Sequence, residues 1–365
     1  MLRFLVRFSL FVVAVALIAL AVGPLLIDPT PASGATSAET LAHPGSRFVE
    51  LPFPGTGGIE LHYLELEQVG PEQQDPNQLD PQPPGLQTPS AEPPEPSATE
   101  TQAPRTFVLL HGFTFNAFTW NRMLDVFAVH GRVLAYDQIP YGLSAKPVPG
   151  TWHGASPYSK AAALEHLMGF LDGLGIERVI LVGNSSGGTL ALEAAVASPE
   201  RVEGLVLLSP WVHANRPIFP EWLTQLPQMR RLTLLLARYL GGDSPLLDYS
   251  YADPSQIDEQ RRALTGVHRE MANWDAAWAA LLNHSLTDPV EISAHLGGIT
   301  QPVLVITGAA DQVVPVADSD ATAAELPNAQ FALLPDCGHV PQEECPQRVA
   351  EVITQWLDTL PPEAP

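Results

Sequence analysis

The sequence is poor in cysteine and in basic side chains. Its 365 residues include two cysteines, and 18 lysine and arginine residues stand against 40 aspartate and glutamate residues. Two cysteines do not make a disulfide framework or a zinc site. The formal net charge of −22 repels phosphate backbones, so nucleic acid is not expected as a partner. Cys337 and Cys345 form either a single bridge, if the domain lies outside the cytoplasm, or two buried thiols.

Patterns typical of cofactor binding are also absent. The sequence has no metal-ligand cluster, no glycine pattern of a dinucleotide-binding fold and no phosphate loop. We therefore expect chemistry that needs no cofactor. Hydrophobic residues make up 45% of the chain, which is enough for a sizeable core. The length suits one large α/β domain with additional segments.

The N-terminus carries an uncharged run over residues 8–27, long enough to span a bilayer core. Arg3 and Arg7 precede the run and acidic residues follow it, a distribution that keeps the N-terminus in the cytoplasm and places the rest outside. We interpret residues 1–27 as a transmembrane anchor of a single-pass membrane protein. A cleaved signal peptide, which would give a secreted or periplasmic protein, is the alternative. Residues 28–46 are predicted to form a tether.

The remaining chain, residues 47–365, is predicted to form one domain. Segments 47–53 and 59–66 alternate apolar and polar residues around a glycine-rich turn, which indicates a β-hairpin. Residues 71–104 contain ten prolines and no aromatic, lysine or arginine residue. Such a segment cannot bury enough apolar surface to offset its ordering entropy, so we predict a disordered loop between two strands.

Short apolar runs then alternate with amphipathic helical segments. The runs lie at residues 107–110, 133–136, 179–182, 205–208, 303–306 and 331–334, and helices are expected over 159–174, 186–198, 317–326 and 345–359. Apolar strands of this kind imply a mostly parallel sheet, here of the eight-stranded type, with helices on both faces. Residues 212–290 contain no strand run and are predicted to form a helical cap.

A nucleophile motif lies between a predicted strand and a predicted helix. It is Gly183-Asn184-Ser185-Ser186-Gly187, the G-x-S-x-G arrangement in its expected context. The glycines allow a tight turn, and the helix N-terminus offers backbone N–H groups to an oxyanion. A serine that merely caps the helix is the alternative. We predict that Ser185 is the catalytic nucleophile.

The partners of the serine are expected after later strands. His339 follows the strand 331–334 in a glycine-rich loop, and Asp311 follows the strand 303–306. The resulting chain order of serine, acid and histidine is that of one known triad type. Asp318 and Asp320 are rival acids, but they fall in the next predicted helix.

An oxyanion hole requires two donors. We assign one to the backbone N–H of Ser186 and the other to the backbone N–H of Phe113, because Gly112 allows close approach after the strand 107–110. His111 is interpreted as a structural residue that braces this loop.

From about residue 47 to 360 the chain resembles the α/β-hydrolase superfamily, in its capped, esterase and carbon–carbon-bond-hydrolase-like form. The resemblance is carried by His111-Gly112-Phe113, Gly183-Asn184-Ser185-Ser186-Gly187-Gly188, Gly308 with Asp311 and Val314-Pro315, and Gly338-His339 with Pro341, Glu343 and Pro346. Dehalogenases and epoxide hydrolases of this superfamily use an aspartate nucleophile, so Ser185 argues against both. Asn184 is similar to the residue found in carbon–carbon bond hydrolases of aromatic ring-cleavage pathways. The segment 137–144 resembles the loop after the next strand, with Ile139 and Pro140 where the family usually has proline and glycine.

The resemblance and the triad together predict a serine hydrolase that cleaves an ester or related acyl bond of a hydrophobic small molecule. Carbon–carbon bond hydrolysis or perhydrolysis on the same triad, and a catalytically silent ligand-binding protein, are the alternatives. Most apolar side chains of the cap are expected to pack it onto the core, while the rest line a substrate pocket. The candidates are Trp211, Phe219, Trp222, Met271, Trp274 and Trp278.

Overall fold

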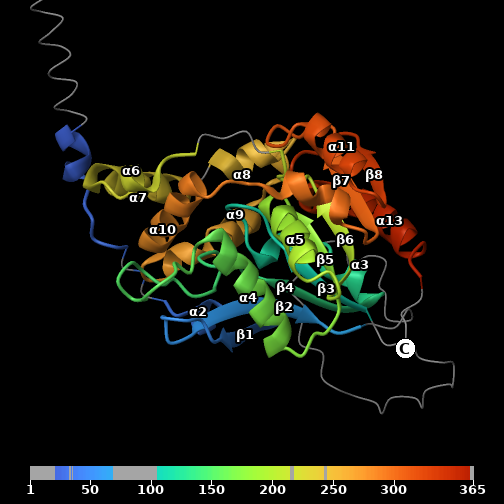
Figure 1. Cartoon of the computed structure of the whole chain (residues 1–365), viewed down its shortest axis with the longest axis horizontal. Coiled ribbons are helices and arrows are strands. Elements are labelled where there is room, and N and C mark those ends of the chain that lie inside the picture. The colour runs from blue at the N-terminus through green and yellow to red at the C-terminus, as the bar shows by residue number, and fades with distance from the viewer. Residues whose placement is uncertain are drawn as a thin grey trace, which may run out of the picture.

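A computed structural model describes residues 21–361, apart from 33, 35, 69–104, 214–217 and 242–244. One sheet of eight strands runs through the molecule in the order β1-β2-β4-β3-β5-β6-β7-β8 (Figure 1). The strands are β1 (Ser46–Leu51), β2 (Ile59–Leu66), β3 (Arg105–Leu110), β4 (Gly131–Tyr136), β5 (Val179–Asn184), β6 (Val202–Leu208), β7 (Val303–Gly308) and β8 (Ala329–Leu334). The β1–β2 and β2–β4 pairs are antiparallel and the others are parallel, which confirms the predicted mostly parallel sheet.

Helices cover both faces of the sheet. On one face α4 (Lys160–Gly173), α5 (Ser186–Ala197) and α11 (Val316–Glu325) pack, and on the other α3 (Leu124–Ala128) and α13 (Pro346–Leu357). Alternate side chains of β3 feed the two cores: Val108 and Leu110 join the first, Phe107 and Leu109 the second. A strand buried on both faces needs apolar residues at every position, and this explains the continuous apolar runs in the sequence.

The cap lies between β6 and β7 and consists of helices. They are α6 (Glu221–Thr224), α7 (Pro227–Leu240), α8 (Pro245–Ser250), η4 (Pro254–Gln256), α9 (Glu259–Thr265), η5 (Val267–Glu270) and α10 (Trp274–Thr287). The indole of Trp278 is fully buried; it stacks on His268 and meets the ring edge of Tyr141 from the loop after β4. These aromatic contacts fasten the cap to the sheet domain.

The segment predicted as a tether lies against the cap. Ala32 N donates to Asp275 Oδ1 at 2.8 Å, and Asn273 N donates to Ala32 O at 2.9 Å. Arg238 donates to the carbonyl of Asp28 at 3.0 Å. Two short helical elements, η1 (Gly23–Leu26) and α2 (Ala38–Leu41), flank this stretch, and η6 (Ile292–Gly298) and α12 (Pro341–Glu344) complete the fold with η3 (Ala117–Trp120).

Two predictions fall on residues outside the described part of the chain. The loop 71–104 is one, and residues 1–20, which hold most of the predicted anchor, are the other. Within the described ranges, none of the helices combines the length and apolar character needed to cross a bilayer.

Candidate active site

Ser185 lies on a sharp turn between β5 and α5. Its backbone has φ 53° and ψ −118°, a conformation rare for a residue with a side chain. The packing around the turn requires glycine: a Cβ on Gly187 would lie 2.1 Å from the carbonyl oxygen of Leu110, and one on Gly112 would lie 3.1 Å from the Cβ of Ser185. The sequence therefore places Ser185 on a turn held by close backbone contacts.

His339 and Asp311 lie on loops at the ends of neighbouring strands, β8 and β7. His339 Nδ1 is 2.9 Å from Asp311 Oδ2, and the other oxygen of Asp311 accepts from the N–H groups of Val313 and Val314 at 2.8 and 2.9 Å. Burial raises the pKa of Asp311, but the hydrogen bond and charge of His339 and the backbone donors outweigh it, so the pKa is lowered. Asp311 is therefore an ionised carboxylate that can accept a hydrogen bond from the N–H of His339 Nδ1. The rival acids Asp318 and Asp320 lie within α11.

Ser185 and His339 border one cavity of about 620 Å³ between the sheet and the cap. Asn184 ties their two loops together, because its Nδ2 donates to the carbonyls of His339 at 3.0 Å and Leu208 at 3.1 Å. The structure thus brings the three predicted residues Ser185, Asp311 and His339 to the same end of the sheet.

The predicted oxyanion donors, Phe113 and Ser186, border the same cavity. Ser186 is the first residue of α5, so its N–H lies at the positive end of that helix dipole. His111 braces the other loop: its Nε2 accepts from Gln138 N at 3.0 Å, which leaves Nδ1 to donate to Gly112 O at 2.8 Å. Burial lowers the pKa of His111, and a neutral bracing ring agrees with the structural role expected for it.

The lining of the cavity is largely apolar. Its apolar part is formed by Phe113, Ile139, Tyr141, Leu190, Trp211, Leu246 and Leu281, and its polar part includes Lys160, His166, Glu193, His284 and Asp288. Of the cap aromatics, Trp211 borders the cavity, and Trp274 and Trp278 are buried in the cap itself. Trp222 does neither, since its side chain is 68% exposed. The expectation that each apolar cap residue packs or lines the pocket was wrong for Trp222.

A buried pair next to the site was missed in the sequence. Asp137 Oδ2 lies 2.7 Å from His62 Nδ1 of β2, and the carboxylate also accepts from Ala117 N at 2.6 Å and Leu143 N at 2.7 Å. Burial opposes its ionisation, but His62 and the N–H donors prevail and lower the pKa of Asp137 to about 2. Asp137 thereby fixes two loops at the active-site end of the sheet. One indication of this pair was present in the sequence, because Asp137 directly follows an apolar strand. Nothing in the sequence around His62 indicated that it would be the partner.

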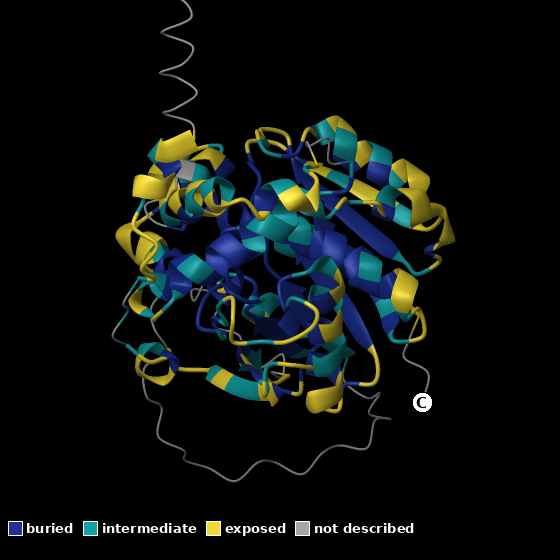
Figure 2. Cartoon of the chain, turned by 60° about the vertical axis from the view of Figure 1, so that its left-hand side comes forward, coloured by how far each residue is buried: buried dark blue, intermediate teal, exposed yellow. Residues whose placement is uncertain are grey.

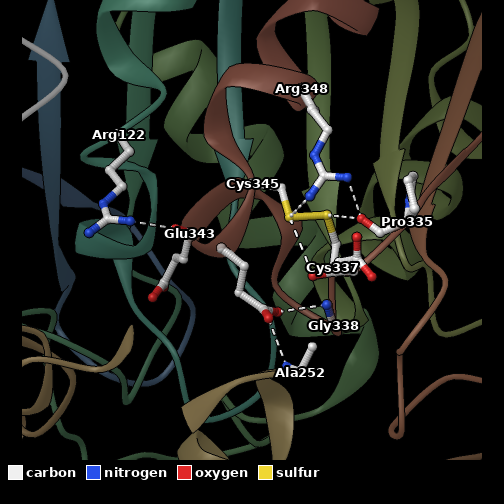
Figure 3. The surroundings of a disulfide bond; sticks show 10 residues. Arg122, Ala252, Pro335, Cys337, Gly338, Glu343, Cys345 and Arg348 are labelled. Carbon is white, nitrogen blue, oxygen red and sulfur yellow. Dashed lines mark hydrogen bonds between the residues drawn. A yellow bond between two sulfur atoms is a disulfide. The ribbon is translucent and has the colours of Figure 1, made fainter. Parts of the chain in front are cut away.

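A disulfide closes the loop that carries His339. Cys337 and Cys345 are bridged, so of the two arrangements left open by the sequence the structure has the bridge (Figure 3). Glu344 accepts from Gly338 N at 2.9 Å and from Ala252 N of the cap at 2.7 Å. Burial raises the pKa of Glu344 to about 7. The disulfide and the carboxyl group of Glu344 together hold the loop of His339 between the sheet and the cap.

No group of three or more histidine, cysteine, aspartate or glutamate side chains within the described ranges is arranged to hold a metal ion. Residues 107–352 match the model of the alpha/beta hydrolase family, and the chain belongs to that family. Its hydrolase and esterase relatives identify it as an enzyme.

The individual relatives span several hydrolases. A 2-hydroxymuconate semialdehyde hydrolase of Pseudomonas putida is 32% identical over 232 residues, which cover 62% of this chain and 76% of the relative. Among solved structures, an esterase of Thermogutta terrifontis is similar with a TM-score of 0.58 and 22% identity, covering 86% of this chain and 99% of the other. A bacterial membrane phospholipase A is similar with a TM-score of 0.59 and 24% identity, over 99% of both chains. At these identities the two structures show a shared fold.

Proposed function

We propose that this enzyme hydrolyses an ester or related acyl bond of a hydrophobic small molecule through an acyl-enzyme on Ser185. The observation that carries the proposal is the hydrogen bond of 2.9 Å between Asp311 and His339, placed at the edge of a largely apolar cavity that Ser185 also borders. Such an arrangement supplies a nucleophile, a base and an orienting acid in one place.

Each group has a defined part in the reaction. Asp311 keeps the proton of His339 on Nδ1, so Nε2 can take the hydroxyl proton of Ser185 as the serine attacks the acyl carbon. The N–H groups of Phe113 and Ser186 then stabilise the oxyanion. His339 returns the proton to the leaving alcohol, and a water molecule, activated by the same ring, hydrolyses the acyl-enzyme.

The direct test is hydrolysis of p-nitrophenyl esters of graded acyl length. We expect turnover with the wild-type chain, a preference for acyl groups that fill the apolar part of the cavity, and loss of turnover in Ser185→Ala. Equal turnover by Ser185→Ala would overturn the proposal.

Carbon–carbon bond hydrolysis on the same triad is the second candidate. It is favoured by the relative at 32% identity, named as a 2-hydroxymuconate semialdehyde hydrolase, and by Asn184 before the nucleophile. Decay of 2-hydroxymuconate semialdehyde absorbance, measured beside ester hydrolysis, separates the two candidates. Faster turnover of the semialdehyde than of every ester would favour the second.

We also propose that residues 8–27 anchor the enzyme in a membrane with the hydrolase domain outside the cytoplasm. The arginines before this run support the orientation, and the Cys337–Cys345 bridge supports an oxidising compartment. Carbonate extraction and protease digestion of spheroplasts test it. Release of the full-length chain by carbonate, or protection of the domain from external protease, contradicts the proposal.

A further inference from the structure

Helix α7 carries two apolar stripes. Leu234 and Ala237 are buried in the cap core with Trp278 of α10. Leu232, Leu235, Leu236 and Tyr239 are exposed, by 41%, 50%, 40% and 59%. Their spacing of i, i+3, i+4 and i+7 is the pattern by which a helix buries one face against an apolar partner. No described part of the chain covers this second stripe.

Neighbouring elements extend the apolar surface. Trp222 of α6 is 68% exposed and Leu26 of η1 is 82% exposed. The start of the described chain is held beside α7, because Gln228 donates to Ala21 O at 3.1 Å and Arg231 donates to Ile27 O at 2.5 Å. We call the six residues Leu26, Trp222, Leu232, Leu235, Leu236 and Tyr239 the outer cap face.

Exposed apolar side chains gather there rather than being scattered over the molecule. Of the 14 large hydrophobic residues that are exposed in the described ranges, ten lie within residues 22–26 and 218–239. Isolated exposed leucines are ordinary, whereas a contiguous apolar area marks an interaction surface. Figure 2 shows exposed residues on the outer helices of the cap, where the described chain begins.

The charge of α7 differs from that of the rest of the molecule. The helix contains Arg230, Arg231 and Arg238 and no acidic residue, although the chain as a whole has a net charge of −22. By helical spacing Arg231 and Arg238 lie at one side of the exposed stripe, whereas Arg230 is in line with the buried Thr233, Leu234 and Ala237. Arg238 is also paired with Asp275 at 2.8 Å. A helix with arginine next to an exposed apolar stripe is typical of helices that lie in the interface of a bilayer with anionic lipids.

The chain itself indicates what covers this surface. The described end of the apolar run 8–27 belongs to this surface, since Ala21 and Ile27 are hydrogen-bonded to α7 and Leu26 is part of the outer cap face. A bilayer that holds the run would be brought against the same helix.

We propose that the outer cap face lies in the headgroup region of a bilayer containing anionic lipid, with α7 parallel to the membrane plane. Leu281 and His284 of α10 border the cavity, and α10 packs against α7, so one helix separates the cavity from the lipid. The proposal rests on the proposed membrane anchoring and is independent of the ester chemistry.

A single fluorescent label tests it in the full-length chain. Both native cysteines are bridged, so Leu235→Cys provides one reactive thiol for an environment-sensitive dye. Leu333→Cys on β8 is the matched control, because Leu333 is 48% exposed and Leu235 50%. The labelled proteins are reconstituted in vesicles of phosphatidylcholine and phosphatidylglycerol, isolated by flotation, and compared with vesicles made from brominated phosphatidylcholine.

We expect brominated lipid to quench the dye at position 235 by about twofold, as for a side chain buried at the headgroup–acyl boundary, and to leave position 333 unchanged. Quenching at position 235 should be stronger in vesicles with phosphatidylglycerol than in vesicles of pure phosphatidylcholine.

Three results overturn the proposal. If the labelled chain does not float with the vesicles, both the proposed anchoring and this inference are refuted, whereas the proposed ester hydrolysis is unaffected. A floating chain whose position 235 stays water-exposed refutes the docking alone. If the dye at position 235 is shielded from water but is not quenched by brominated lipid, another occupant covers the surface. Shielding that rises with protein concentration would assign the surface to a second copy of the chain. Shielding that does not change with concentration would assign it to residues 8–20.

Discussion

At the scale of single residues, the orientation of one imidazole ring decides whether the site can work. Asp311 Oδ2 accepts from His339 Nδ1 at 2.9 Å while Asp311 Oδ1 is held by the N–H groups of Val313 and Val314. The carboxylate can therefore not rotate away from the ring. This geometry fixes the tautomer that leaves Nε2 free to accept a proton from Ser185.

Asp311→Asn should reduce kcat for a p-nitrophenyl ester by roughly 10² to 10⁴, because an asparagine amide can donate to Nδ1 and favour the wrong tautomer. The melting temperature should change much less than the activity. Asp318→Asn, on the neighbouring helix α11, is the control and should be nearly neutral. Retention of more than about a tenth of kcat, a loss of only ~1.4 kcal/mol in transition-state stabilisation, would place the acid elsewhere.

Asp137→Asn should destabilise the fold by roughly 3 kcal/mol or more at pH 7, because it leaves His62 without its buried partner. The pKa of Asp137 is lowered from 3.8 to about 2, so its contribution is present above about pH 4 and is lost as pH falls through about 2. Urea unfolding between pH 2 and 7 should show a steeper loss of stability at acid pH in the wild type than in the variant, in which Asp311 still contributes.

The matched control for Asp137→Asn is Asp172→Asn, which removes an exposed partner of Arg201 and should cost less than about 1 kcal/mol. The same acid slope in Asp137→Asn as in the wild type would show that another group titrates.

The proximity of the three candidate site residues was predictable from their positions relative to strands. Ser185, Asp311 and His339 each follow an apolar run, so parallel strand ends bring them together. The pair of His62 and Asp137 was not predictable, because its members are 75 residues apart and meet only through the antiparallel pairing of β2 and β4. No local pattern encodes that pairing.

At the scale of elements, the loop between β8 and α13 depends on its cross-link. The Cys337–Cys345 bridge encloses His339, and Glu344 adds hydrogen bonds to Gly338 and Ala252. The loop, α12 and the cap are thereby connected around His339, the proposed catalytic base.

The double variant Cys337→Ser and Cys345→Ser should lose about 2–3 kcal/mol of unfolding free energy, the loop-closure value for a ring of this size. Its kcat should fall as well, because His339 loses one of its supports. Melting with and without reductant measures this: reductant should lower the melting temperature of the wild type only. Equal melting temperatures for both chains without reductant would mean that the bridge contributes nothing.

The positions of helices and strands could be predicted from the sequence more accurately than the contacts that each of them makes. The expected helix 159–174 is observed as α4, one residue shorter at each end, and the expected helix 186–198 as α5, one residue shorter at its C-terminal end. The surroundings of α7 were not predictable, because that helix is apolar on two sides and a periodic pattern does not say which side is covered. Trp222 of α6 was assigned to packing or pocket lining because an apolar side chain in the sequence does not show whether it is covered.

At the scale of the whole molecule, the sheet explains how the inserted segment 71–104 is accommodated. Leu66 at the end of β2 pairs with Val133, and Arg105 at the start of β3 pairs with Gly131, both on β4. The end of β2 and the start of β3 therefore lie on the two sides of β4, at the same end of the sheet and about 10 Å from each other. A short connection can replace a long one there.

Replacing residues 71–104 by a short glycine–serine linker should keep the fold and ester hydrolysis. Loop-closure entropy changes slowly with length, so the melting temperature should move by a few degrees, on the order of 1 kcal/mol or less. Thermal melting and kcat of the shortened chain are the measurements. Failure to fold would show that the segment packs on the domain.

The overall architecture was predictable because apolar runs alternate with helical segments from residue 105 onward, and that alternation specifies a covered parallel sheet. The path of residues 28–32 along the cap was not predictable. Its hydrogen bonds to the cap use main-chain atoms, such as Ala32 N and O, which leave no side-chain pattern in the sequence.

The central claim, that Ser185 is a nucleophile activated by His339, is tested most directly by reaction with a fluorophosphonate and mass spectrometry of the peptides. The account predicts one phosphonyl group per chain, on Ser185, absent in Ser185→Ala and formed far more slowly in His339→Ala. Labelling of another residue, or an unlabelled wild-type chain that still hydrolyses esters, would contradict it.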